Sequence, residues 1–166
     1  MVSQTTGRPA TILLAEDNDD HAELIMNCLN GHHLTRKVIR VSDGEETLDY
    51  LFHRGDRIDP EKHPVPDLIL LDLRMPKISG LEVLEEVKTS EGLRRIPVVI
   101  LTTSSAKHDI TQAYDLGANS YLIKPVEFQA LSQMLDDLGR FWVTWNQSHH
   151  FSTSAGSGMD ESETDS

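Results

Sequence analysis

Five short runs of mostly apolar residues, each ending in polar residues, constrain the fold of this chain more than any other feature. The runs span residues 11–15, 38–41, 68–71, 98–101 and 121–123. Short apolar runs with polar ends are typical of strands that are covered on both faces of a sheet. The sequence therefore predicts five buried β-strands.

A segment with helical spacing of its apolar residues follows each predicted strand. These segments lie at residues 19–30, 45–53, 81–88, 110–116 and 128–145. Alternating strands and helices imply a parallel sheet with helices on both faces, because parallel strands are joined by crossover connections. We therefore expect an α/β fold with a doubly wound, five-stranded parallel sheet in the order (βα)5.

Polar residues follow four of the predicted strands at the edge of the sheet where chemistry is expected. In doubly wound sheets the ligand site lies at the carboxyl ends of the strands. The residues in question are Glu16 and Asp17 after the first strand, Asp72 after the third, Thr102 after the fourth and Lys124 after the fifth. We expect these side chains to converge on one site.

The three carboxylates of this set repel one another. Two unit charges about 4 Å apart cost roughly 4 kcal/mol at an effective dielectric constant of 20. Either one carboxyl takes up a proton or a cation neutralises the group, and a hard dication such as Mg2+ prefers oxygen ligands. A bound dication would keep Asp72 ionised and nucleophilic, with Lys124 and the Thr102 hydroxyl near the same oxygens. The residues therefore predict phosphoryl transfer to the Asp72 carboxylate, giving an acyl phosphate.

The motifs of this chain resemble those of the receiver domains of two-component response regulators. The acidic pair Glu16-Asp17, the acceptor segment LILLDLRMPKISG, the threonine segment PVVILTTSS and the segment NSYLIKP occur in the order and spacing of that family. The resemblance covers residues 10–145. It implies the flavodoxin-like (βα)5 fold of CheY-like receivers.

The resemblance also implies a phosphoacceptor and a set of metal ligands. Asp72 is the implied phosphoacceptor. Mg2+ (or Mn2+) would be bound by Asp17, Asp72 and the backbone carbonyl of Arg74, with Glu16 acting directly or through water.

Three further residues are implied to bind phosphate or to report the phosphorylated state. The hydroxyl of Thr102 would move toward the phosphate, the ring of Tyr121 would turn inward, and Lys124 would pair with the phosphate. The resemblance also predicts a cis peptide bond before Pro125, since an X-Pro bond adopts the cis form at modest cost.

A narrower resemblance concerns the partners of this chain. The proline-rich segment 55–66, the stretch LTTSSAKHDI and the aromatic stretch FWVTWN are similar to the single-domain regulators of phytochrome-type histidine kinases, especially cyanobacterial ones. The expected partners are a sensor histidine kinase of this type and a downstream protein that the sequence does not identify. The same features also occur in regulators that other sensor kinases serve.

Composition excludes several classes of function. The formal net charge is −12, whereas binding of nucleic acid needs a basic surface and an anionic membrane would repel the chain. No signal peptide and no apolar run of membrane-spanning length is evident. The single cysteine, Cys28, leaves no internal disulfide, and together these features favour a cytoplasmic protein.

We expect one receiver domain at residues 10–146, preceded by a flexible N-terminus at 1–9 and followed by an acidic, disordered tail at 147–166. Phe141, Trp142 and Trp145 exceed what the core of one small sheet needs. Exposed aromatic side chains are typical of interfaces. These three residues are therefore the candidates for a homodimer contact.

Two other functions fit parts of the pattern. A phosphatase of the haloacid dehalogenase type also uses an Asp nucleophile with Mg2+, but it needs a DxDxT-like motif, and Leu-Arg-Met-Pro follows Asp72 here. A pseudo-receiver that binds without being phosphorylated would not need Asp72, Thr102 and Lys124 together. The scattered histidines are more consistent with surface positions than with a zinc site. We therefore expect a signalling switch and no enzyme beyond self-catalysed uptake and loss of phosphate.

Overall fold

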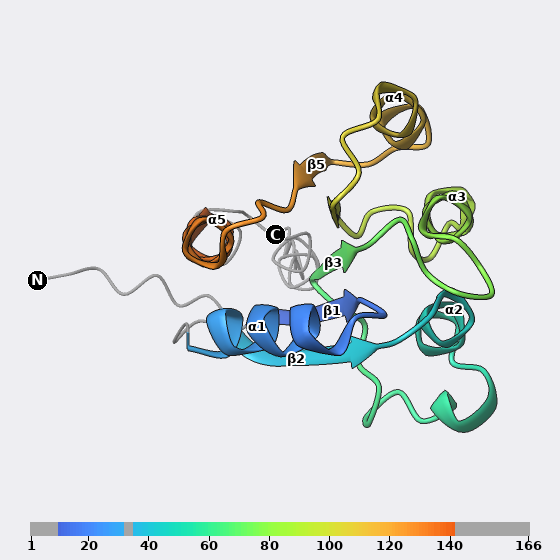
Figure 1. Ribbon diagram of the computed structural model, residues 1–166. Helices are drawn as coiled ribbons and strands as arrows, with labels where there is room; N and C mark the ends of the chain where they lie inside the picture. Colours follow the sequence, from blue (N-terminus) through green and yellow to red (C-terminus); the bar gives the residue numbers. More distant parts are fainter. Residues whose placement is uncertain (1–9, 32–34, 142–166) are drawn as a thin grey trace, which may run out of the picture.

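In the computed structural model, which describes residues 10–31 and 35–141, strands and helices alternate along the chain (Figure 1). The strands of this part are β1 (Ala10–Ala15), β2 (Thr35–Val41), β3 (Leu68–Leu71), β4 (Val98–Thr102) and β5 (Ser120–Ile123). The helices are α1 (Asp19–Asn30), α2 (Gly44–Leu51), α3 (Gly80–Thr89), α4 (Lys107–Asp115) and α5 (Phe128–Gly139), with a 3-10 turn η1 (Gly55–Arg57) after α2. The predicted order (βα)5 is confirmed.

The five strands form one parallel sheet in the order β2-β1-β3-β4-β5. Helices α1 and α5 cover one face, and α2, α3 and α4 cover the other (Figure 1). The chain therefore winds outward in both directions from β1 and β3. This arrangement is the doubly wound, flavodoxin-like fold, and its switch point lies between the carboxyl ends of β1 and β3.

The core consists of two apolar layers, one on each face of the sheet. Leu13 of β1 packs into the layer under α2, α3 and α4, whereas Ile12 and Leu14 pack into the layer under α1 and α5. Successive side chains of a strand point to opposite faces. The central strands β1, β3 and β4 are buried on both faces, and each has a continuous apolar run in place of an alternating pattern. The expectation of full burial is wrong for the edge strands β2 and β5, which contain partly exposed residues because each pairs with one neighbour only.

Gly80, the first residue of α3, lets the chain after β3 return close to Asp72. A Cβ atom at Gly80 would lie 2.2 Å from the backbone oxygen of Asp72. The backbone N–H of Gly80 donates to the carbonyl of Leu73 at 2.9 Å. Ser79 and Glu82 then form a capping box that starts α3. The glycine therefore holds the loop after the predicted phosphoacceptor against the end of β3.

One expectation about the backbone is wrong. The described residues contain no cis peptide bond, so the bond between Lys124 and Pro125 is trans. The trans form is the lower in energy for X-Pro bonds by about 0.5–1 kcal/mol. The loop after β5 adopts it with Val126 fully exposed to solvent.

Two other expectations lie wholly or partly outside the described residues. Trp142, Trp145 and the segments expected to be flexible or disordered belong to the parts that the structure does not describe.

Among the described residues, no helix combines the length and the apolar character that a membrane crossing requires.

Candidate functional site

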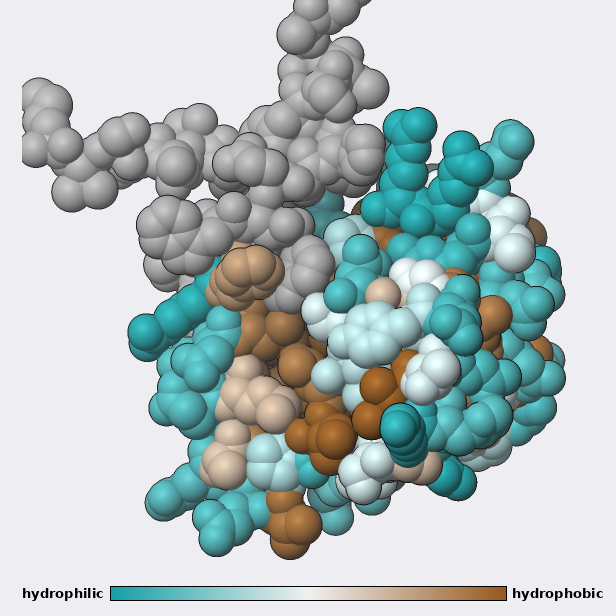
Figure 2. Space-filling view, turned by 90° about the horizontal axis from the view of Figure 1, so that it is seen from above, coloured by the Kyte–Doolittle hydropathy of each residue, from teal (hydrophilic) through white to brown (hydrophobic). Residues whose placement is uncertain are grey.

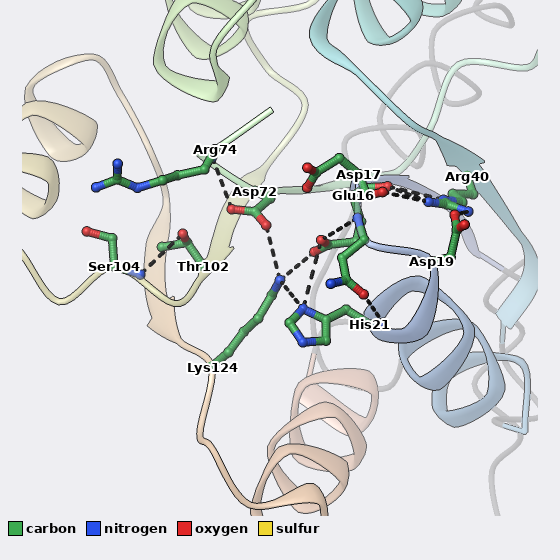
Figure 3. A network of polar contacts seen from close by, with 11 residues as sticks. Glu16, Asp17, Asp19, His21, Arg40, Asp72, Arg74, Thr102, Ser104 and Lys124 are labelled. Atoms are coloured by element: carbon green, nitrogen blue, oxygen red, sulfur yellow. Dashed lines mark hydrogen bonds and ion pairs between the residues drawn. The ribbon is translucent and has the colours of Figure 1, made fainter. Parts of the chain in front are cut away.

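The acidic residues expected at the strand ends come together at the carboxyl edge of the sheet (Figure 3). Glu16, Asp17 and Asp72 each offer a carboxylate oxygen, and these oxygens lie within 4.8 Å of one another. Glu16 and Asp72 are buried, whereas Asp17 is exposed. The cluster lies beside the switch point because β1 and β3 are neighbours in the sheet.

Lys124 reaches into this cluster from the end of β5. Its Nζ atom lies 2.5 Å from Oε2 of Glu16 and 3.1 Å from Oδ2 of Asp72. The side chain of Lys124 is only 2% exposed. A buried charge without its partner is strongly destabilising, so the ammonium and the two carboxylates depend on one another. As expected from its place after β5, Lys124 supplies a positive charge beside the carboxylate oxygens.

The protonation of Glu16 reflects its burial. Burial raises the pKa of the Glu16 carboxyl, Lys124 lowers it and the charge of Asp72 raises it, and the net result is a pKa of about 7. The backbone N–H of Asn18 also donates to Glu16 Oε1 at 3.2 Å. One ammonium therefore does not fully compensate three neighbouring carboxylates, which is the condition in which a second cation is favoured.

The donor atoms of the cluster fit a hard divalent cation. All of them are carboxylate oxygens, and the exposure of Asp17 leaves access for water molecules, which Mg2+ keeps in its coordination shell. The backbone N–H of Arg74 donates to Oδ1 of Asp72 at 3.2 Å, so the backbone of Arg74 lies beside the cluster. The part of the Arg74 carbonyl as a ligand stays a prediction.

Thr102 lies at the end of β4, next to the cluster, and is fully buried. Its hydroxyl oxygen accepts a hydrogen bond from the backbone N–H of Ser104 at 3.4 Å. The Ser104 hydroxyl donates to Oδ2 of Asp109 at 2.6 Å, and the guanidinium of Arg74 lies 3.5 Å from the same oxygen. The loop after β4 is therefore connected both to Thr102 and to the residue two positions after Asp72.

Tyr121 of β5 contacts the same loop. Its phenol O–H donates to the carbonyl of Ser104 at 2.9 Å, and its half-buried ring packs against the core. Burial raises the pKa of the phenol, which keeps it protonated and able to donate. Thr102, Tyr121 and the loop between them thus form one connected unit beside Asp72.

A comparison of this chain with known protein families agrees with this geometry. The model of the response regulator receiver domain matches residues 12–136. The chain belongs to this family. The receiver identity and the flavodoxin-like fold expected from the motifs are both confirmed, and a response regulator receiver is a component of two-component signalling.

Relatives of this receiver cover most of its length. It is 44% identical over 141 residues to the probable methanogenesis regulatory protein FilR2 of Methanothrix harundinacea, and the match covers 84% of this chain and 88% of FilR2. It is 37% identical over 142 residues to the response regulator Rcp1 of Synechocystis sp., and the match covers 86% of this chain and 95% of Rcp1. Each match therefore covers more than four fifths of this chain.

Solved structures resemble this receiver closely. The phosphorylated cyanobacterial phytochrome response regulator RcpA has a TM-score of 0.81 and 38% identity, and the match covers 85% of this chain and 99% of that chain. The Mn2+-bound form of Rcp1 has a TM-score of 0.79 and 36% identity, and the match covers 84% and 99%. One similar protein therefore carries phosphate and another a divalent cation.

Arg40 is a residue of the receiver site that the sequence analysis missed. From β2, its Nε and a terminal nitrogen donate to the carbonyl of Glu16 at 3.1 and 3.0 Å, and the same terminal nitrogen donates to the carbonyl of Asp17 at 3.3 Å. Its other terminal nitrogen lies 2.8 Å from Oδ1 of Asp19. Arg40 therefore holds the acidic loop in place (Figure 3). The signal in the sequence that could have found Arg40 is its position as a basic residue within the otherwise apolar run 38–41.

His21 is the second missed residue. It lies in the first turn of α1, and its Nδ1 atom is 3.2 Å from Nζ of Lys124 (Figure 3). The histidines are expected at surface positions, and His21 is partly exposed but also contacts a buried residue of the site. Its position four residues after Asp17, in the helix that leaves the acidic loop, was the signal that could have found it.

Of the three aromatic residues expected at a dimer contact, the structure describes one. Phe141, just after α5, is 56% exposed. Trp142 and Trp145 lie outside the described residues.

Proposed function

We propose that this receiver is a phosphorylation switch that accepts a phosphoryl group on Asp72 from a partner histidine kinase. An Asp72 oxygen would form a bond to phosphorus while the bond from phosphorus to the kinase imidazole breaks, and the imidazole leaves with the electron pair. The observation that carries the proposal is the position of Asp72. It is buried at the end of β3, in one cluster with Glu16 and Asp17 and 3.1 Å from Lys124.

Each residue of the site has a part in this reaction. Glu16, Asp17 and Asp72 would hold Mg2+ (or Mn2+), together with the backbone carbonyl of Arg74. The ion, when bound, would neutralise negative charge on the carboxylates and on the transferred group. The clustered carboxylate oxygens of this chain and the Mn2+-bound form of the similar Rcp1 support this assignment.

The remaining residues would bind the product. Lys124 would pair with phosphoryl oxygens, and the hydroxyl of Thr102 would donate to one of them. A phosphoryl group adds about −1.5 to −2 charges at neutral pH. Such a charge shifts a two-state equilibrium only through contacts that differ between the states. The connected unit of Thr102, Ser104 and Tyr121 offers these contacts.

We propose a phytochrome-type photoreceptor kinase as the phosphodonor. RcpA is a phytochrome response regulator and 38% identical to this chain, which supports this choice. The test is phosphotransfer from a purified phytochrome-type kinase compared with an unrelated histidine kinase. Faster transfer from the unrelated kinase would reject the phytochrome partner and leave the switch itself intact. The downstream partner would be a protein that contacts the switch surface, and a kinase partner together with the single cysteine favours the cytoplasm.

A homodimer contact is proposed at the end of the molecule that carries β5 and α5. Figure 2, which looks onto the top of Figure 1, has apolar side chains gathered in a hollow on this face. The large exposed apolar residues of this part of the chain are Tyr114, Ile123, Val126, Phe128 and Phe141. Sedimentation equilibrium of the full chain and of Phe141→Asp would test the contact, with a monomeric wild type as the contrary result.

Intact mass spectrometry tests the switch. The protein is incubated with Mg2+ and acetyl phosphate, and the expected result is a gain of one phosphoryl group that Asp72→Asn lacks. Steady release of inorganic phosphate at enzyme-like rates would favour a phosphatase instead. No modification by acetyl phosphate or by any kinase would favour a pseudo-receiver that only binds partners.

A further inference from the structure

The ammonium of Lys124 has a complete set of hydrogen-bond acceptors. A lysine ammonium carries three N–H donors and accepts none. Its neighbours are Oε2 of Glu16 at 2.5 Å, Oδ2 of Asp72 at 3.1 Å and Nδ1 of His21 at 3.2 Å (Figure 3). The three acceptors come from the ends of β1 and β3 and from the first turn of α1. His21 is therefore the third acceptor of a buried cation.

The contact specifies one form of the imidazole. Nδ1 can accept from the ammonium only when the ring proton is on Nε2, since a protonated Nδ1 would place two donors against each other. The backbone of His21 is also held, because its N–H donates to Oδ1 of the cap residue Asn18 at 3.0 Å. The side chain of His21 is 38% exposed, against 2% for Lys124. His21 thus covers the ammonium on the solvent side from a fixed helical turn.

The two carboxylate acceptors have a second task under the proposed function. Glu16 and Asp72 belong to the acidic cluster that would hold the divalent cation, and Asp72 would also carry the phosphoryl group. A dication on these oxygens competes with the ammonium of Lys124. The imidazole of His21 is neutral in the required form and is not one of the three carboxylates, and its Nδ1 atom lies nearer to Nζ of Lys124, at 3.2 Å, than to Oε1 of Glu16, at 4.0 Å. It is the acceptor that stays available to Lys124 while the carboxylates serve the cation.

We propose that His21 is a positioning residue for Lys124 and sets the rate at which Asp72 takes up a phosphoryl group. The proposal rests on the proposed function, in which Lys124 stabilises the charge of the transferred group. His21 keeps Nζ near Asp72 when the carboxylates are occupied. Without this acceptor the ammonium spends less time in the productive position.

Two substitutions separate positioning from packing. His21→Leu keeps the bulk of the ring and removes the acceptor, whereas His21→Asn places an amide oxygen near the position of Nδ1. With acetyl phosphate and saturating Mg2+, we expect uptake by His21→Leu to fall roughly tenfold and uptake by His21→Asn to stay within about twofold of wild type, as the loss of one hydrogen bond to a charged group implies.

A control and a stability measurement accompany this comparison. His108→Leu changes an exposed histidine in the first turn of α4 and should leave uptake unchanged. Thermal unfolding of each variant identifies any loss of uptake that comes from misfolding. Equal rates for His21→Leu and His21→Asn, with both proteins folded, would overturn the proposal.

A second measurement needs neither metal nor phosphate. Nitrogen-15 NMR of the metal-free full chain at about pH 8.5, above the ordinary titration range of imidazole, should show His21 with its proton on Nε2. The Nδ1 resonance should shift in Lys124→Met. A proton on Nδ1 in the wild type, or an unchanged resonance in a folded Lys124→Met, contradicts the proposal. If the wild type takes up no phosphate, the proposed function fails, and this NMR result alone decides whether His21 binds Lys124.

Discussion

The phenol of Tyr121 donates a hydrogen bond to the backbone carbonyl of Ser104 across 2.9 Å and so connects β5 to the loop that leaves β4. Ser104 in turn donates through its N–H to the hydroxyl of Thr102. The aromatic and the threonine expected to report the phosphorylated state are therefore linked through one residue. A change at either end of this link has a direct route to the other.

Tyr121→Phe tests the link. It keeps the ring in the core and removes the hydrogen bond, so the free energy of unfolding should fall by about 0.5–1.5 kcal/mol. Amide hydrogen exchange should accelerate in residues 103–106 and stay unchanged in β2, which lies at the opposite edge of the sheet. Unchanged exchange in residues 103–106 would show that the phenol does not hold this loop.

Lys124→Met tests the balance of charge in the cluster. Removing the ammonium leaves Glu16 and Asp72 buried side by side, and we expect a loss of about 3–5 kcal/mol in unfolding free energy at neutral pH without metal. Chemical denaturation of the variant and of the wild type measures this loss. Mg2+ should restore part of it, because a bound cation supplies the missing charge.

The same cluster predicts a pH dependence for the metal-free protein. The folded-state pKa of Glu16, about 7, lies above its ordinary value of 4.5. The folded state then binds a proton more tightly than the unfolded state, so the stability due to this group is present at low pH and is lost as the pH rises through about 7. In Lys124→Met the deficit should be smaller at about pH 5.5 than at about pH 8. A larger deficit in acid would contradict this account of Glu16.

Arg40→Ala tests whether the acidic loop is held for metal binding. Arg40 binds the carbonyls of Glu16 and Asp17, and loss of such an outer contact typically lowers metal affinity about 10–100-fold. Isothermal titration with Mg2+ measures the effect. Arg40→Lys should rescue little, since an ammonium lacks the planar fork of the guanidinium. Arg95→Ala, at an exposed position between α3 and β4, is the control.

Gly80→Ala tests the close approach of the loop to Asp72. The new Cβ atom would meet the backbone oxygen of Asp72 at 2.2 Å, so the chain must shift, and we expect a loss of more than about 2 kcal/mol in unfolding free energy. A Cβ atom at Gly92 would meet nothing within 4 Å. Gly92→Ala should therefore leave stability unchanged or raise it slightly, and equal effects of the two changes would argue against the tight loop.

The sequence predicted the centre of the sheet well because β1, β3 and β4 are buried on both faces. The run 68–71 coincides with β3, whereas β2 begins three residues before the predicted run. β2 lies at the edge of the sheet and pairs only with β1, so it tolerates exposed polar residues such as Lys37. A run of apolar residues predicts the bounds of a central strand well, but it predicts the first residue of an edge strand less well.

The site was predicted where residues follow strands and missed where contacts depend on register. Asp72 and Lys124 stand directly at strand ends. Arg40 reaches the acidic loop because it is paired in register with Leu14 of β1, and His21 reaches Lys124 because the helix cap fixes the first turn of α1. The spacing of the sequence motifs determines neither the register of strand pairing nor the geometry of a helix cap. The expected cis bond before Pro125 failed for a similar reason, since local sequence allows both isomers.

The position of Lys124 among the acidic residues has a consequence for electroneutrality. With the three carboxyls of Glu16, Asp17 and Asp72 ionised, one ammonium leaves a surplus of two negative charges, and a single divalent cation cancels it. The proposed phosphorylation of Asp72 would form an acyl phosphate, which removes one carboxylate charge and adds a phosphoryl group with a charge of about −1.5 to −2. With the dication bound, the unphosphorylated site would thus be close to neutral, whereas the phosphorylated site would carry a net negative charge. Under the proposed function, the signal would begin as a net charge at this edge of the sheet that the side chains of the site do not neutralise.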